Sequence, residues 1–275
     1  MADQLVAMFP QHLHYVEPFA GGLSVLLARD PEGVSEVVND LDGQLTTFWR
    51  VLQDPVQFAE MQYRLTMTPA SQVEYDWAEY ILAKDPIEWS AVLRACAFFV
   101  CCRQSMAGRM QSFTPLTRTR TRRGMNELAS AWLSAIDGLP AVHERLRRVV
   151  IRNRPALEVI RQEDGPDTFF YADPPYAPTT RTAPNVYAHE MTVADHEALL
   201  TLLRSVEGKV MLSGYPSDLY DTALAGWHVH DFHVSNHAAS GKVKRKMVER
   251  VWMNYQPPSM SVVAANTTTN TLFEE

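Results

Sequence analysis

Thr168-Phe169-Phe170-Tyr171-Ala172 is a short apolar run that leads directly into Asp173-Pro174-Pro175-Tyr176. Its length and aromatic content are typical of a buried strand, and a pair of prolines ends such a strand. The pattern therefore predicts a strand whose carboxyl end carries a stiff loop with one carboxylate and one aromatic ring. A simple strand-ending turn would use the same residues, because Asp-Pro commonly opens loops and tyrosine is common at pocket rims.

The loop residues suit the methylation of an exocyclic amine on a nucleobase. The lone pair of such an amine is delocalised into the ring, so a catalyst must hold the amine hydrogens and turn the lone pair towards the methyl donor. Asp173 offers a carboxylate, and Pro174, which has no N–H, leaves its carbonyl oxygen free as a second acceptor. Tyr176 offers a flat face to a base that has left its stack. The prolines hold these groups in line with the donor.

A second motif, Tyr15-Val16-Glu17-Pro18-Phe19-Ala20-Gly21-Gly22, lies about 150 residues upstream and precedes an apolar stretch over residues 23–28. It predicts a strand, a glycine turn that lets the backbone approach a cofactor, and a helix. About 20 residues later, Val37-Val38-Asn39-Asp40 predicts a second strand that ends in a carboxylate, where ribose hydroxyls are usually held. A glycine pair alone more often marks a plain turn than a cofactor site. Because the chain has neither Gly-x-Gly-x-x-Gly nor Lys-Ser/Thr after the turn, S-adenosylmethionine is favoured over dinucleotides and nucleoside triphosphates.

Together these motifs resemble those of the Dam-type N6-adenine-specific DNA methyltransferases of phages, prophages and bacteria. Residues 17–22 resemble the cofactor motif of that family, residues 39–42 its ribose motif, residues 173–176 its catalytic loop, and Leu212-Ser213-Gly214-Tyr215 a segment beside the target base. The resemblance implies catalytic roles for Asp173, Pro174, Pro175 and Tyr176. It also implies cofactor-binding roles for Glu17, Pro18, Phe19, Ala20, Gly21, Gly22, Asp40 and Asp173.

Two features depart from the family pattern. Relatives usually open with a Gly-Gly-Lys segment that holds the methionine end of the cofactor, whereas this chain starts Met1-Ala2-Asp3-Gln4-Leu5. We therefore expect a truncated start, substitution by other groups, or weakened cofactor binding. Asn153-Arg154-Pro155 stands where many relatives have an acidic residue near the adenine of the cofactor, so no residue is assigned to that role.

Basic residues are concentrated in two segments, although the net charge of the chain is −7. Residues 101–126 contain six arginines and no acidic residue. Uncompensated like charges suit a polyanion, although a solvated loop would also tolerate them. We expect double-stranded DNA to be bound by these arginines and by a second basic cluster: Arg103, Arg109, Arg118, Arg120, Arg122, Arg123, Lys242, Lys244, Arg245 and Lys246.

The alternation of strands and helices predicts an α/β Rossmann-like methyltransferase fold, with a mostly parallel sheet of about seven strands and helices on both faces. Between residues 54 and 150 this alternation stops and helical patterns take over. We therefore expect a catalytic domain from residues 1–53 and 151–255, an inserted, mainly helical DNA-recognition region at 54–150, and a disordered tail at 256–275. The polar segment 177–189 is expected to be a flap over the site.

Composition agrees with a large enzyme domain, since the chain has 275 residues and is 46% hydrophobic. No apolar run approaches the roughly 18 residues of a spanning helix, and residues 1–10 lack the features of a signal peptide. Cys96, Cys101 and Cys102 have no matching Cys/His pair elsewhere, so we expect reduced, mostly buried thiols and no metal site. These features predict a cytoplasmic protein, and the resemblance to the Dam-type family implies a bacterium or a phage-infected cell.

The function expected from the sequence is transfer of methyl from S-adenosylmethionine to the N6 amine of an adenine flipped out of DNA. Alternatives with the same site chemistry are methylation of cytosine N4, of RNA, or of a protein glutamine. A catalytically silent DNA-binding homologue is the alternative from another class. Thr271-Leu272-Phe273 faintly resembles a peptide that binds sliding clamps, a pattern that commonly arises by chance. The recognised DNA sequence, the oligomeric state and the biological role, whether phage self-protection, restriction-modification or regulation, stay open.

Overall fold

The computed structural model describes residues 1–115, 118–176, 190–235 and 246–258. The described helices are α1 (Ala2–Val6), α2 (Ser24–Ala28), α3 (Gly43–Gln53), α4 (Pro55–Met67), α5 (Gln72–Leu82), α6 (Ala91–Gln104), α7 (Glu127–Leu146), α8 (Ala156–Glu163), α9 (Val193–Leu203) and α10 (Asp218–Ala223), with two 3₁₀ turns, η1 (Pro86–Glu88) and η2 (Met106–Gly108). The described strands are β1 (His14–Glu17), β2 (Ser35–Asn39), β3 (Thr121–Arg122), β4 (Met125–Asn126), β5 (Val150–Arg152), β6 (Thr168–Ala172), β7 (Lys209–Gly214), β8 (His228–Ser235) and β9 (Lys246–Met253).

Seven strands form one sheet in the order β5-β2-β1-β6-β7-β9-β8. Strand β1 runs parallel to β2 and β6, and β7 continues the parallel part beside β6. Strand β9 is antiparallel to both β7 and β8. The predicted mixed, mostly parallel sheet of about seven strands is therefore confirmed.

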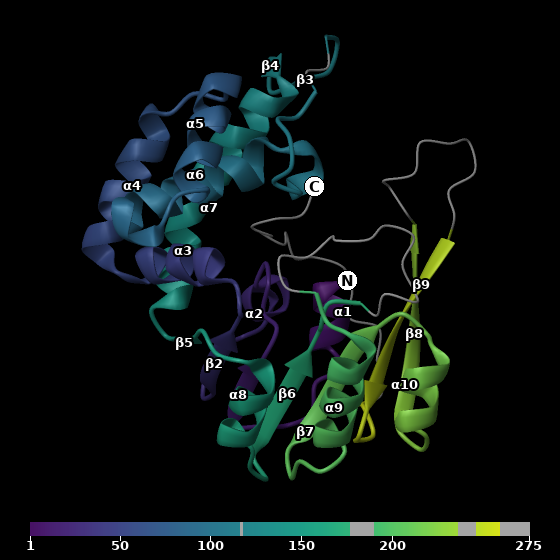
Figure 1. Cartoon of the computed structure of the whole chain (residues 1–275). Helices are drawn as coiled ribbons and strands as arrows, with labels where there is room; N and C mark the ends of the chain where they lie inside the picture. Colours follow the sequence, from purple (N-terminus) through teal and green to yellow (C-terminus); the bar gives the residue numbers. More distant parts are fainter. Residues whose placement is uncertain (116–117, 177–189, 236–245, 259–275) are drawn as a thin grey trace. The chain divides into compact units, whose positions relative to one another are not determined.

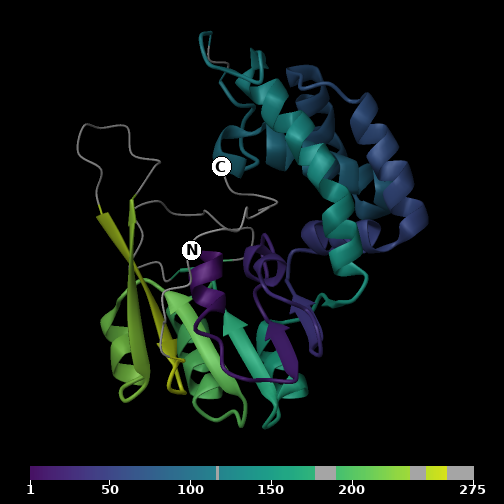
Figure 2. The same cartoon turned by 180° about the vertical axis from the view of Figure 1, so that it is seen from behind.

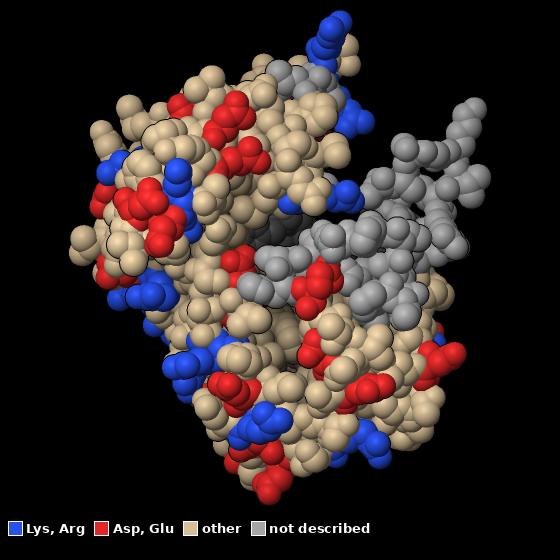
Figure 3. All heavy atoms as spheres, in the orientation of Figure 1, with Lys and Arg blue, Asp and Glu red and all other residues tan. Residues whose placement is uncertain are grey.

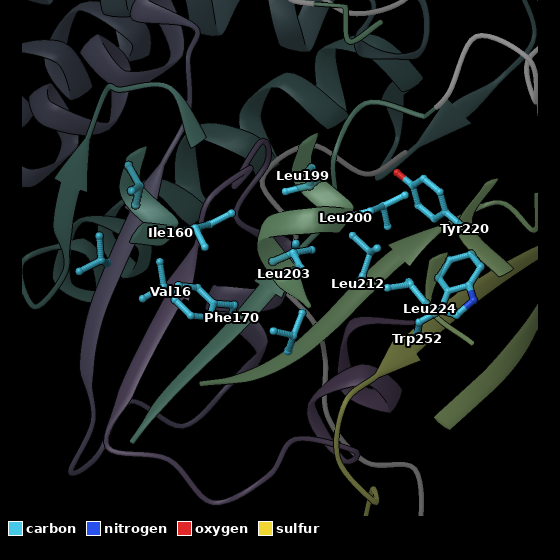
Figure 4. Close-up of a cluster of buried hydrophobic side chains, with 14 residues drawn as sticks. Val16, Ile160, Phe170, Leu199, Leu200, Leu203, Leu212, Tyr220, Leu224 and Trp252 are labelled. Carbon is cyan, nitrogen blue, oxygen red and sulfur yellow. The ribbon is translucent and has the colours of Figure 1, made fainter. Parts of the chain in front are cut away.

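Helices α8, α9 and α10 cover one face of this sheet, and α1 lies on the opposite face (Figures 1 and 2). Side chains from β1, β6, β7 and β9 meet the three helices in one buried cluster, which includes Val16, Phe170, Leu199, Leu212 and Trp252 (Figure 4). A capping box starts α9: the Thr192 hydroxyl accepts from the Asp195 N–H, and the Asp195 carboxylate accepts from the Thr192 N–H. The core thus fixes the strands whose ends carry the predicted site.

Strand β6 is buried along its whole length because both faces of the sheet are covered. Phe170 and Ala172 belong to the cluster under the helices. Phe169 points to the other face, where its ring lies 4.5 Å from that of Phe9 in an edge-on contact. This double burial explains why β6 is a continuous apolar run without polar alternation.

The chain divides into two compact units. The first consists of residues 1–20, 30–41 and the described part of 154–265, and the second contains residues 21–29 and 42–153. Helix α3, which we expected in the catalytic domain, groups with the second unit, where Phe48 of α3 contacts Phe98 and Phe99 of α6. The assignment of residues 54–150 to DNA recognition stays a prediction.

The second unit is mainly helical, with one small hairpin made of β3 and β4. Arg123 and Gly124 occupy its two-residue turn with φ values of 56° and 77°. Positive φ at both turn positions is the geometry that matches the twist of a tight hairpin. Arg123 is held in this unusual conformation while its guanidinium donates to the Ser134 hydroxyl at 2.7 Å.

Candidate active site

The predicted catalytic and cofactor segments follow strands that lie side by side. Strands β2, β1, β6 and β7 are parallel neighbours, so their carboxyl ends meet at one edge of the sheet. At this edge stand Glu17 at the end of β1, Asp40 after β2, Asp173 after β6, and Ser213 near the end of β7. Four segments that are far apart in the sequence are thereby brought together.

Asp173 lies on the sheet face that does not pack against α8 and α9. Side chains two residues apart in a strand point to the same face, so Asp173 shares a face with Tyr171, and Ser213 shares a face with Met211. Because Tyr171 is paired with Met211 of β7, Asp173 and Ser213 lie on the same face of the sheet. The Ser213 hydroxyl makes a side-chain hydrogen bond with the Asp173 carboxylate. Desolvation by the surrounding protein raises the pKa of Asp173 to about 7, the charge of Glu249 adds to the rise, and the Ser213 hydrogen bond opposes it.

The Asp173 side chain nevertheless reaches solvent. Protein atoms are dense around it, but water still has access to the carboxylate and screens its charge. Solvent thus moderates the upward shift of the Asp173 pKa without reversing it. A carboxylate of this kind is both accessible to a ligand and only partly ionised near neutral pH.

Tyr176 is held from two sides. Its hydroxyl donates to Oε1 of Glu249 at 2.7 Å, and its ring lies 4.3 Å from the ring of Tyr215 at an interplanar angle of 54°. Pro174 is buried and Pro175 is half-buried, so the loop between Asp173 and Tyr176 is fixed at both ends and along its length. The predicted flap at 177–189 lies outside the described residues.

At the end of β1, Glu17 is buried and accepts a hydrogen bond from the Tyr15 hydroxyl at 2.5 Å. The next residue, Pro18, is buried and Phe19 is half-buried against the core of the first unit. Gly21 adopts φ = +46°, a conformation that suits glycine, and no atom of the described residues, apart from its chain neighbours, lies within 4 Å of where a Cβ would stand. Helix α2, which follows Gly22, has only five residues.

Asn39 holds this edge of the sheet together, a role that the sequence did not reveal. Its side-chain amide donates to the carbonyls of Pro18 and Arg154 at 2.9 and 3.0 Å, and its Oδ1 accepts from the Arg154 N–H at 2.9 Å. The backbone carbonyl of Asn39 accepts from Ala20. One buried amide thus ties the loop after β1 to the turn before α8.

The two acidic residues of the predicted ribose motif are in different environments. Asp42 is the N-cap of α3, where its carboxylate accepts from the backbone N–H groups of Gln44 and Leu45. Asp40 is half-buried directly after β2. Asp42 is therefore committed to the helix, which leaves Asp40 as the better candidate for a ligand hydroxyl.

The predicted DNA-binding arginines belong to the second unit. Arg109, Arg118, Arg120, Arg122 and Arg123 are exposed, whereas Arg103 is half-buried on α6. Lys and Arg atoms gather at the end of this unit where Figure 1 places β3 and β4 (Figure 3). Lys242, Lys244 and Arg245 lie outside the described residues, as does Thr271-Leu272-Phe273, and the side chain of Lys246 is not described either.

The three cysteines are free: Cys101 and Cys102 are buried and Cys96 is half-buried. Burial raises the pKa of Cys96 and of Cys101 to about 12, and that of Cys102 further still. The expectation of mostly buried thiols is confirmed. In the part of the chain that the structure describes, no group of three or more His, Cys, Asp or Glu side chains could hold a metal ion, and no helix is long and apolar enough to cross a membrane.

Comparison with known proteins gives one family match. The family model described as D12 class N6 adenine-specific DNA methyltransferase matches residues 1–239. No curated protein sequence matches. Among solved structures, an rRNA methyltransferase, aviRa from Streptomyces viridochromogenes, is similar with 12% identity and a TM-score of 0.36, over 91% of this chain and 80% of that one.

Proposed function

The chain belongs to the D12 class of N6 adenine-specific DNA methyltransferases, and from this premise we propose that the edge of the sheet around Asp173 is the place where the adenine amine is methylated. One observation carries the proposal: an accessible carboxylate, held by Ser213, stands beside a tyrosine ring fixed by Glu249 and Tyr215. The pairing of an acceptor for amine hydrogens with a rigid aromatic face is what an extrahelical adenine requires.

Methyltransferases of this family generally take the methyl group from S-adenosylmethionine, and the residues at this edge of the sheet fit that ligand. The half-buried carboxylate of Asp40 suits the ribose hydroxyls. Glu17 and Asp173 both act electrostatically on Tyr171, so two carboxylates lie near one point, an environment that suits a sulfonium cation. Gly21 and Phe19 complete the proposed cofactor contacts. When bound, the cofactor supplies an electrophilic methyl group.

In this reaction the residues of the protein hold and orient the target base. Asp173 and the carbonyl of Pro174 accept the two hydrogens of the N6 amine and turn its lone pair out of conjugation with the ring. As positive charge develops on the nitrogen, the carboxylate stabilises it more strongly than it stabilises the neutral amine, which lowers the barrier. Tyr176 stacks on the base and recovers part of the stacking lost when the base leaves the duplex. The departing proton passes to solvent, to which Asp173 is open.

The exposed arginines of the second unit bind the phosphates of double-stranded DNA. Arg118, Arg120 and Arg122 alternate along the segment that enters the β3–β4 hairpin, and each is exposed. Arg120 is 3.9 Å from Glu127, an exposed pair that costs little to break. Phosphate contacts of this kind supply affinity without reading sequence.

The experiment that tests the proposal compares Asp173→Ala with the native chain. Turnover should fall about 100-fold or more, because an interaction made mainly in the transition state is removed. Binding of S-adenosylmethionine, followed by calorimetry, should stay within about threefold, a change of less than about 1 kcal/mol. Asp40→Ala should show the opposite pattern, with weakened cofactor binding. Unchanged turnover in Asp173→Ala would refute the catalytic assignment.

A further inference from the structure

Glu249 is a carboxylate beside the proposed site that belongs to none of the motifs found in the sequence. It lies on β9, the strand that pairs antiparallel with β7, with Gly214 opposite Arg250 and Ser213 opposite Val251. In this register Glu249 comes level with the point where β7 ends and the chain continues to Tyr215.

Strand alternation places Glu249 on the same face of the sheet as Asp173. Trp252 of β9 packs into the cluster under the helices, so Val251 and Glu249 point to the opposite face. Ser213 lies next to Val251, and its hydroxyl is hydrogen-bonded to Asp173. Glu249 therefore faces the site although it is about 75 residues away from Asp173 in the sequence.

The two carboxylate oxygens of Glu249 have different surroundings. Oε1 accepts the hydrogen bond from the Tyr176 hydroxyl at 2.7 Å. Oε2 is buried and has no hydrogen-bond partner among the described residues. A buried acceptor without a partner is costly, and natural folds keep few of them. The charge at this position is also felt by Asp173, Tyr171 and Tyr215.

We propose that Glu249 is a positioning residue for methyl transfer, which acts by holding the Tyr176 hydroxyl and thereby the ring on which the target base stacks. The proposal rests on the proposed function, since it needs a base bound at Asp173 and Tyr176. The Tyr215 ring limits the movement of Tyr176 on one side, and the hydrogen bond to Glu249 fixes its tip. If the Tyr176 ring rotated freely, the base stacked on it would present its amine poorly to Asp173. Small misplacements of reacting groups lower the reaction rate strongly.

The test uses Glu249→Ala, Glu249→Gln, Tyr176→Phe and the double variant Glu249→Ala/Tyr176→Phe. Glu197→Ala, which removes an exposed carboxylate on α9, is the matched control. Rates are measured with unmethylated DNA and S-adenosylmethionine, and cofactor binding is measured separately. Thermal unfolding identifies any variant that does not fold.

Glu249→Ala and Tyr176→Phe should each lower kcat/KM for DNA by about 10- to 100-fold, the range expected for a hydrogen bond to a charged group. The double variant should lose no more than either single one, because both changes break the same bond. Glu249→Gln keeps an acceptor oxygen and should recover a large part of the rate. Cofactor affinity should change less than about twofold in all of them, and Glu197→Ala should match the native chain.

Glu249→Gln adds a readout that a purely structural role would not move. Removing the negative charge should shift the acidic limb of the pH–rate profile to lower pH. Among the described residues, the groups that interact with Asp173 are Tyr171 on β6, Ser213 and Tyr215 at the end of β7, Tyr220 on α10 and Glu249 on β9, and Glu17 of β1 also acts on Tyr171. Within the described part of the chain, Glu249 is the carboxylate whose charge raises the pKa of Asp173, and Tyr176→Phe keeps it, so the shift should be absent in Tyr176→Phe.

Equal rates for Glu249→Ala and the native chain would overturn the inference, and so would losses that add in the double variant. If Glu249→Ala does not fold, Glu249→Gln and Tyr176→Phe still test the inference. An unchanged rate in Tyr176→Phe, or a pH–rate profile of Glu249→Gln that matches the native one, would then overturn it. Failure of the proposed function gives a different result: the native chain would then transfer no methyl group to DNA, or Asp173→Ala would remain active.

Discussion

Asp173 should set the pH dependence of methyl transfer. Its carboxyl accepts amine hydrogens only when it is ionised, and its pKa is raised to about 7 by desolvation and by the charge of Glu249. The value of kcat/KM should therefore rise with pH from about 6 and level off above about 8, in steady-state rates measured at constant ionic strength. A rate that is independent of pH across this interval, or that increases towards acid, would contradict the assigned role.

Ionisation of Asp173 should lower the free energy of unfolding at neutral pH. An aspartate whose folded pKa lies above its unfolded value binds its proton more tightly in the folded state, so its contribution to stability is largest below the unfolded pKa of about 4 and is lost as pH rises to about 7. Asp173→Asn does not titrate, and it should unfold at a higher urea concentration than the native chain at pH 8 but at a similar one at pH 4. A variant that is less stable at pH 8 would show that the carboxylate is well solvated in the fold.

At the scale of elements, Asn39 should be the residue on which the carboxyl edge of the sheet depends most. Asn39→Ala removes three side-chain hydrogen bonds and leaves the carbonyls of Pro18 and Arg154 without their donor. The free energy of unfolding should fall by about 3 kcal/mol, and cofactor affinity should fall with it because the loop after β1 loses its support. Denaturant unfolding measures the first effect and calorimetry the second. A loss below about 0.5 kcal/mol would mean that water replaces the amide.

The β3–β4 hairpin should carry much of the salt-dependent DNA affinity. Replacing Arg118, Arg120 and Arg122 by Ala should reduce the magnitude of the negative slope of log K against log salt by about 2.7, since each phosphate contact contributes about −0.9. Arg64→Ala is a matched control, because Arg64 is exposed on α4 and paired with Glu60 at 2.8 Å. Fluorescence anisotropy with duplex DNA at several salt concentrations measures the slope. An unchanged slope in the triple variant would move the DNA contact elsewhere.

Strong local patterns predicted most of the elements. Strand β6, the glycine turn after β1 and strand β2 all lie where the sequence predicts them. Strand β8 was not predicted, because exposed His228, Asp231 and His233 hide the alternation of an edge strand. Glu249 was missed for a different reason: its place at the site depends on the pairing of β9 with β7, which no local pattern records.

At the scale of the whole molecule, S-adenosylmethionine should stabilise the fold. A ligand that binds only the folded state at about 100 times its Kd adds about 2.7 kcal/mol, so Tm should rise by about 5 °C. ATP, which shares the adenosine but not the sulfonium, serves as a control and should give a smaller shift. Thermal unfolding measures both. No shift with S-adenosylmethionine at millimolar concentration would contradict the proposed cofactor site.

The recognised DNA sequence does not follow from the fold, because base contacts depend on which side chains enter a groove. The cytoplasmic location stays a prediction, as do the roles of the basic residues at 242–246. What the fold does supply is a rigid sheet edge with Asp173, Tyr176 and Glu249 on one face, and this edge suits the reaction of the family.

The most direct test is transfer of an isotopically labelled methyl group from S-adenosylmethionine to unmethylated duplex DNA, followed by digestion to nucleosides and mass analysis. We predict label in N6-methyldeoxyadenosine from the native chain and none from Asp173→Ala. Label in N4-methyldeoxycytidine would contradict the assignment of the acceptor, and so would label that appears only when RNA or protein is supplied in place of DNA. Absence of label in every product, with the cofactor bound, would contradict the catalytic role of the Asp173 edge.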